Sequence, residues 1–176
     1  NSETAAAFSR FAAMMAAHFE GRVSHFITLN EPQIVLKLGY ADGIHAPGKR
    51  LSLPELVSCW KNLMLAHGLS FRAIRKAAPE ALIGIASTGK LCYPHSPADE
   101  DAARQETFRL TDSDWMFTHA IVLDAVCLGR AEPEAGALRK LLSEVTPEEW
   151  DTMHAVPDFI GVNSYNGSEI AAGPDG

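Results

Sequence analysis

Three short apolar runs, separated by long stretches with helical periodicity, set the strongest limit on how this chain can fold. The runs lie at residues 23–29, 81–86 and 158–165. The second run is apolar at every position, which is typical of a strand covered by helices on both faces. Strands that alternate with helices predict a parallel sheet whose connections are right-handed crossovers. We therefore expect an α/β protein.

The first apolar run leads into Asn30, Glu31 and Pro32. Pro32 has no N–H group for a strand ladder, so we expect the strand to end before it. A residue before proline is disfavoured in the α region, so we expect the Glu31 side chain to leave an extended backbone. In parallel α/β folds, ligands bind at the carboxyl ends of the strands. Asn-Glu-Pro alone is nevertheless more typical of an ordinary turn, because Asn and Pro both favour turns.

The third run also ends in polar residues, namely Asn163, Ser164 and Tyr165. The carboxyl ends of parallel strands lie at the same edge of a sheet. We therefore expect Glu31, Asn163 and Tyr165 to face one hollow, although their spacing in the sequence does not prove it.

Apolar residues at helical spacing predict helices over residues 3–19 and 53–78, the second opened by the Ser-x-x-Glu capping box at 52–55. His67 falls on the buried face of the second helix, so we interpret it as a core histidine. The Gly- and Pro-containing stretch 33–50 is predicted to be a loop. Its Tyr40 and His45 are candidates to line a pocket, or merely to pin the loop. Shorter helices are predicted after residue 99, from 115, and over 133–143 and 147–153, and the tail from 166 shows no periodicity.

Composition narrows the classes of function. The 176 residues carry a net charge of −7, which argues against nucleic-acid binding. The nearest approach to a basic cluster is Arg72, Arg75 and Lys76, which we interpret as a solvent-exposed helix face. No apolar run approaches the ~20 residues that a membrane span requires. The three cysteines form no C-x-x-C pair, so we expect no structural zinc site, and a reduced, cytoplasmic compartment is favoured. We also expect no other metal site and no cofactor.

The sequence Thr-Leu-Asn-Glu-Pro at 28–32, after an apolar run, resembles the acid/base signature of family 1 glycoside hydrolases, the β-glucosidase family. Three further stretches are similar to later parts of that family's pattern and follow in the same order. These are the loop 45–48, the helix segment 62–68 and the strand 158–165. The resemblance implies a partial (β/α)8 barrel, about strands four to six, with residues 1–176 in a single catalytic domain.

The resemblance also implies roles for individual residues. Glu31 matches the general acid/base, and Asn30 matches the residue that hydrogen-bonds the 2-hydroxyl of the sugar. Asn163 matches a polar residue beside the acid/base, and Tyr165 matches the tyrosine that hydrogen-bonds the nucleophile carboxylate. A retaining glycosidase uses one carboxyl group to protonate the leaving oxygen and a second, ~5–5.5 Å away, to attack the sugar. The expected partner is a small β-glycoside or oligosaccharide.

One departure from the family pattern limits the expectation. The family's nucleophile lies in a Glu-Asn-Gly motif, and this sequence contains none. A closed (β/α)8 barrel typically needs about 250 residues. We therefore expect the chain to need the rest of a barrel and to be inactive alone.

Two alternatives stay open at this point. The first is a non-catalytic carbohydrate-binding or interaction module on a degenerate barrel. The second is a different α/β protein such as a nucleotide-binding sheet, although no Gly-rich phosphate loop follows any predicted strand.

Overall fold

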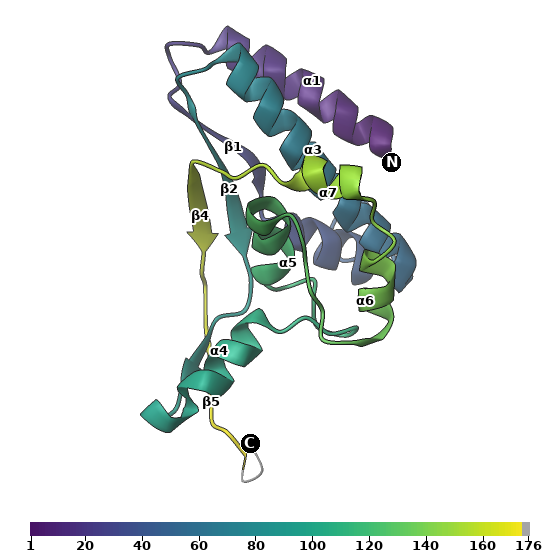
Figure 1. The fold of residues 1–176 in the computed structure, drawn as a ribbon, viewed down its shortest axis with the longest axis vertical. Helices are drawn as coiled ribbons and strands as arrows, with labels where there is room; N and C mark the ends of the chain where they lie inside the picture. The colour runs from purple at the N-terminus through teal and green to yellow at the C-terminus, as the bar shows by residue number, and fades with distance from the viewer. Residues whose placement is uncertain (174–176) are drawn as a thin grey trace.

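The computed structural model describes residues 1–173, apart from the side chain of Ser2. Its centre is a sheet of three parallel strands in the order β1-β2-β4, which confirms the predicted parallel sheet (Figure 1). The strands are β1 (His25–Asn30), β2 (Leu82–Thr88) and β4 (Phe159–Asn163). All three therefore end at the same edge of the sheet, as we expected.

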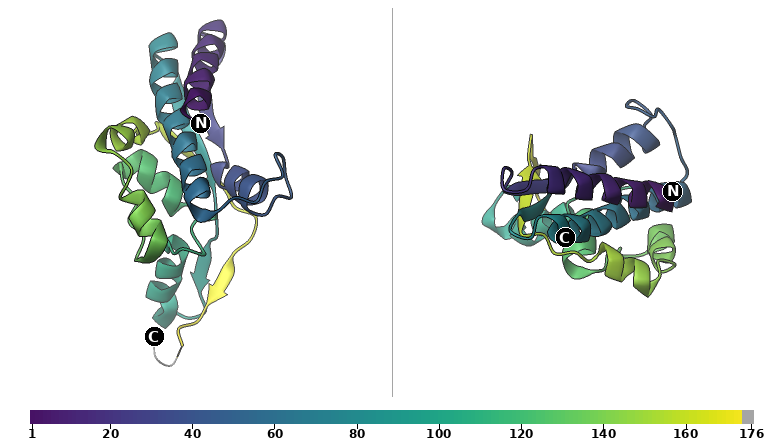
Figure 2. Two further views of the ribbon diagram at one scale, coloured as in Figure 1. Left: turned by 90° about the vertical axis from the view of Figure 1, so that its right-hand side faces the viewer. Right: turned by 90° about the horizontal axis from the view of Figure 1, so that it is seen from above.

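Two long helices, α1 (Ser2–His18) and α3 (Leu53–Ala77), run side by side next to this sheet (Figure 2). The side chain of Asn1 caps α1 by accepting a hydrogen bond from the Glu3 amide at 2.8 Å. The predicted capping box opens α3, because the Ser52 amide donates to Glu55 Oε2 at 2.8 Å. Both predicted helices are confirmed to within one or two residues.

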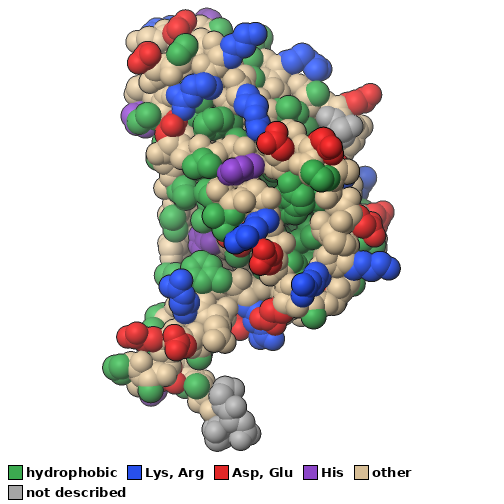
Figure 3. Space-filling model, viewed as in Figure 1, with side chains coloured by type: hydrophobic (Ala, Val, Ile, Leu, Met, Phe, Trp, Pro, Cys, Tyr) green, Lys and Arg blue, Asp and Glu red, His purple; other side chains and the backbone are tan. Residues whose placement is uncertain are grey.

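The remaining elements are short. A second, two-stranded parallel sheet and helix α4 form an arm that projects beyond the carboxyl ends of the central strands (Figures 1 and 3). The other helices follow the ends of β1 and β2 or precede β4. In chain order these elements are α2 (Pro32–Ile34), the π-helix η1 (Val35–Ala41), β3 (Cys92–Pro94), the 3₁₀ helix η2 (Pro97–Asp99), α4 (Glu100–Phe108), α5 (Ala120–Leu123), the π-helix η3 (Asp124–Leu128), α6 (Gly136–Leu142), α7 (Pro147–Met153) and β5 (Ser168–Ile170).

Three local predictions were wrong. Residues 33–41, expected in a loop, are helical, because Pro32 occupies the first turn, where a missing N–H costs no helical hydrogen bond. The helix expected from residue 115 begins only at Ala120. The tail expected to be irregular contains β5, whose backbone pairs with β3 and so needs no side-chain periodicity.

Two of the basic residues on α3, interpreted as a solvent-exposed face, also contact neighbouring elements; Arg72 and Lys76 are exposed. The guanidinium of Arg72 donates to the carbonyls of Asp151 and Thr152, at 2.7 and 2.6 Å, and so ties α3 to α7. Arg75 forms a salt bridge with Asp158, the residue before β4. These arginines therefore hold elements together at the surface of the protein.

The main core lies between the sheet and the helices α3, α5, α6 and α7. Trp60 on α3 is fully buried, and its Nε1 donates to the Ile121 carbonyl at 2.9 Å. Gly68 brings α3 and α7 into contact, since a Cβ there would lie 1.8 Å from the Thr152 carbonyl oxygen. The other large buried side chains of this core include Leu36, Met64, Ile85, Trp115, Ile121, Leu138 and Met153.

Apolar side chains on the central sheet are also exposed. Ile27 on β1 is 50% exposed, and Ile160 and Val162 on β4 are 43% and 63% exposed. Alternate residues of a strand point to the same face. Ile160 and Val162 therefore mark one uncovered apolar face of β4. None of the helices in residues 1–173 is long and apolar enough to cross a membrane.

His67 is fully buried, as predicted for a core histidine. Its Nδ1 lies 2.7 Å from Thr28 Oγ1 and its Nε2 lies 3.0 Å from the Ala155 carbonyl oxygen. A carbonyl only accepts, so Nε2 carries the proton. Burial lowers the pKa of His67, which keeps the ring neutral in the folded protein.

This burial predicts that stability falls as the pH falls from 7.5 to 5.5. Below about 6.5 an unfolded histidine binds a proton that folded His67 does not, so acid favours unfolding. Burial also lowers the pKa of His119, which acts in the same direction. Urea unfolding at both pH values should show the loss. His67→Gln should cost about 1–3 kcal/mol at pH 7.5 and give a shallower pH dependence, whereas an unchanged slope would contradict this account.

Candidate active site

Glu31 follows β1 directly, and its backbone is not extended as expected. It adopts the left-handed conformation, with φ 49° and ψ 56°. Its N–H donates to the Ala86 carbonyl at 2.8 Å and thereby continues the pairing of β1 with β2. Pro32 disfavours the right-handed α region at Glu31, and the immediate turn into α2 is incompatible with an extended strand. A left-handed non-glycine residue costs about 1–3 kcal/mol and persists only where its surroundings enforce it, often at functional sites.

The carboxylate of Glu31 is held by side chains from the far side of the sheet. Its Oε1 accepts hydrogen bonds from Asn163 Nδ2 at 2.7 Å and from the Tyr165 hydroxyl at 2.9 Å. Asn163 Nδ2 also lies 3.3 Å from Asn30 Oδ1. The structure therefore brings together all four residues singled out by the sequence, across the end of the intervening strand β2. Thr88 helps to align the rim, because its hydroxyl donates to the Asn163 carbonyl at 3.1 Å.

Tyr165 hydrogen-bonds the candidate acid/base. Its hydroxyl donates to Glu31 Oε1, and its implied bond to a nucleophile carboxylate stays a prediction, because this sequence contains no Glu-Asn-Gly motif. The bond to the Glu31 carboxylate raises the pKa of Tyr165, because loss of the phenolic proton would place two negative charges together. The ring is 79% exposed, so it can be reached from solvent.

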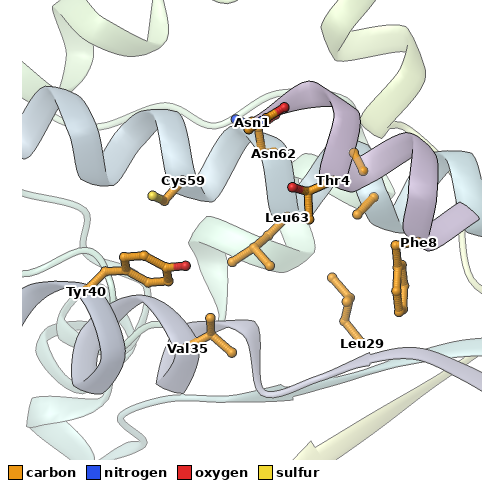
Figure 4. A pocket seen from close by; sticks show the side chains of 11 residues that line it. Asn1, Thr4, Phe8, Leu29, Val35, Tyr40, Cys59, Asn62 and Leu63 are labelled. Carbon is orange, nitrogen blue, oxygen red and sulfur yellow. The ribbon is translucent and has the colours of Figure 1, made fainter. Parts of the chain in front are cut away.

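The site lies on an open rim, and the hollow expected beside Glu31 is not enclosed by these residues. A pocket of about 340 Å³ lies elsewhere, between α1, α3 and η1 (Figure 4). Tyr40 points into that pocket, with Leu29, Val35 and Cys59 among the other lining residues. His45 is exposed on the loop after η1. Of the two candidates to line a pocket, Tyr40 therefore does line one, whereas His45 is not among its lining residues. That pocket does not contain Glu31, because η1 turns this stretch toward the helices.

A buried polar group behind Glu31 was not foreseen. Gln33, two residues later, is fully buried and hydrogen-bonds Ser87 near the end of β2. The apolar run predicted as a strand ends at Ala86, but β2 continues through Ser87 to Thr88. In the sequence, the signal for this buried polar contact is a polar residue, Ser87, directly after a buried apolar run. Within residues 1–173, no group of three or more His, Cys, Asp or Glu side chains is placed to hold a metal ion.

Comparison with known proteins decides the family. The family model of glycosyl hydrolase family 1 matches residues 1–175. The chain belongs to glycosyl hydrolase family 1. This membership confirms the resemblance seen in the Thr-Leu-Asn-Glu-Pro sequence at 28–32.

Several of the similar proteins are named as β-glucosidases. The chain is 27% identical to "Beta-glucosidase A" of Thermotoga maritima over 175 residues, which cover 99% of this chain and 38% of that protein. It is 34% identical to "Beta-glucosidase 25" of Oryza sativa subsp. japonica, over 94% of this chain and 35% of that one. The chain thus spans a little over a third of the length of these relatives.

The structural neighbours agree with this assignment. The β-glucosidase from Thermotoga maritima in complex with cyclophellitol matches with a TM-score of 0.79 and 27% identity, over 99% of this chain and 38% of that structure. The virulence factor SghA from Agrobacterium tumefaciens matches with a TM-score of 0.78 and 28% identity, over 96% and 36%. The three-stranded sheet of this family 1 chain and its helices are therefore a segment of an α/β barrel.

Proposed function

We propose that residues 1–176 are the acid/base-bearing section of a retaining β-glycosidase, about strands four to six of its single (β/α)8 catalytic domain. The observation that supports this best is the placement of Glu31 at the tip of β1, with Asn163 and Tyr165 on its carboxylate. The β-glucosidase names of the relatives favour a small β-glycoside as substrate. The longer chain that would contain these residues is called the complete enzyme below.

The hydrogen bonds suggest how Glu31 would act. Both donors reach Oε1, and no hydrogen bond to Oε2 is formed among the described residues. Oε2 is therefore the oxygen that would carry the proton to the leaving group. In the second step the carboxylate would accept a proton from the water that releases the sugar. Asn30, beside Asn163, would bind the sugar 2-hydroxyl, where hydrogen bonds strengthen in the transition state.

Completion of the site requires a second carboxylate. Because the sequence has no Glu-Asn-Gly motif, the nucleophile would come from another part of the complete enzyme. The same polypeptide would cover Ile160 and Val162, since a large exposed apolar surface marks an interaction site. Tyr165, which is exposed in this chain, would then contact both the Glu31 carboxylate and the nucleophile carboxylate.

The stereochemistry of hydrolysis tests this proposal. Proton NMR of the complete enzyme acting on an aryl β-glucoside should show the β-anomer of the sugar before mutarotation. First appearance of the α-anomer would contradict a retaining mechanism. Sugar binding with no hydrolysis would instead support the non-catalytic module and overturn the assignment as an enzyme.

A further inference from the structure

Gln33 makes an unusual set of bonds for a fully buried glutamine. Its Nε2 donates to Ser87 Oγ at 2.7 Å and to the Thr118 carbonyl at 3.1 Å, and its Oε1 lies 3.5 Å from the Thr88 amide. The two backbone partners determine the orientation of the amide. A carbonyl needs a donor and an N–H needs an acceptor, so a flipped amide would oppose both. Gln33 thus joins the segment after β1 to the end of β2 and to the segment before α5.

The network continues from Ser87 to His119. Ser87 Oγ lies 2.9 Å from His119 Nδ1, and both residues are buried. Among the described residues Ser87 Oγ hydrogen-bonds no acceptor other than His119 Nδ1, so we assign its proton to that bond and the Nε2–H tautomer to a neutral His119. Every bond in this chain of three side chains then has a donor and an acceptor. A buried polar network that is satisfied in this way rigidifies its surroundings.

The network lies directly behind Glu31. Only Pro32, itself buried, separates the two residues, and Pro32 fixes its own φ angle. Glu31 keeps a strained left-handed backbone, which requires restraint on both sides. The bond to Ala86 supplies the restraint before Pro32, and Gln33 supplies it after.

We propose that Gln33 is a positioning residue for general acid catalysis, which acts with Ser87 and His119 to hold Glu31 in its left-handed conformation. This inference rests on the proposed function, because it assumes that Glu31 is the acid. Gln33 itself touches no substrate. Loss of its bonds lets the Glu31 carboxyl move away from the leaving oxygen.

Gln33→Met tests the role, since methionine has nearly the same shape and forms none of the three bonds. The value of kcat/KM reports the step in which the leaving group departs. Departure of phenol from phenyl β-glucoside needs a proton from Glu31 more than departure of dinitrophenol from 2,4-dinitrophenyl β-glucoside does. A displacement of about 1 Å can cost about 100-fold. We expect Gln33→Met to lower kcat/KM of the complete enzyme about 10–100-fold for the phenyl substrate and much less for the dinitrophenyl substrate. Ser87→Ala should act in the same direction, more weakly.

Trp60→Phe is the matched control, because it removes a buried hydrogen bond to the Ile121 carbonyl away from the rim. It should lower stability but leave the ratio of the two kcat/KM values unchanged. Equal losses for both substrates in Gln33→Met, or a change in the ratio with Trp60→Phe, would overturn the positioning role. If Gln33→Met does not fold, the ratio of the two kcat/KM values in Ser87→Ala tests the positioning role instead. Glu31→Gln separates the acid role of Glu31 from the positioning role of Gln33. If Glu31→Gln lowers kcat/KM selectively for the phenyl substrate while the Gln33 and Ser87 variants do not, only the positioning role is rejected.

Discussion

Glu31→Gln is expected to lower kcat/KM of the complete enzyme for phenyl β-glucoside by about 10²–10⁴-fold, the usual contribution of general acid–base catalysis. Glutamine keeps the shape of the side chain, and its Oε1 can still accept from Asn163 and Tyr165. It has no acidic proton to give to a departing phenolate. The loss should be much smaller for 2,4-dinitrophenyl β-glucoside, whose leaving group departs without protonation. Initial rates with the two substrates measure the difference.

Glu169→Gln provides the matched control for this variant. Glu169 lies on β5 in the projecting arm, and its carboxylate lies 3.3 Å from His95 Nδ1 rather than at the Glu31 cluster. The change has the same chemistry, so both kcat/KM values should stay near those of the unmodified enzyme. Equal losses for both substrates in Glu31→Gln would argue against Glu31 as the acid.

The second large expected effect is that the isolated 176-residue chain shows no turnover. Retaining hydrolysis needs a nucleophile ~5–5.5 Å from the acid/base, and we propose that this carboxylate belongs to the rest of a barrel. The open rim around Glu31 would also leave a bound sugar in contact with water. Purified residues 1–176 should therefore release no nitrophenol from an aryl β-glucoside when the complete enzyme at the same molar concentration does.

Host glycosidases are the main source of error in that assay. The chain with Glu31→Gln, purified in the same way, measures this background. Turnover that appears with the unmodified chain and disappears with Glu31→Gln would refute the need for further polypeptide. Turnover of equal size in both samples would be contamination, and the prediction would stand.

Local chemistry allowed much of the fold to be predicted. The capping box at Ser52 placed the beginning of α3 correctly, because a cap depends only on residues within one turn. The apolar runs located β1, β2 and β4. An element stabilised by a distant partner was not predicted: β5 forms only because it pairs with β3. The start of α5 was also missed, because it begins at Ala120 and not at the expected residue 115.

The grouping of Asn30, Glu31, Asn163 and Tyr165 could be anticipated, because parallel strands of one sheet end on one edge and the family pattern marks these residues. The sequence by itself thus determined the three strands of the central sheet, the identity of the candidate acid and the family. Only the tertiary structure decided the left-handed backbone of Glu31, the acceptance of both hydrogen bonds by its Oε1, and the burial of Gln33. These features depend on atoms from segments 54 or more residues apart, and no local pattern specifies how such segments meet.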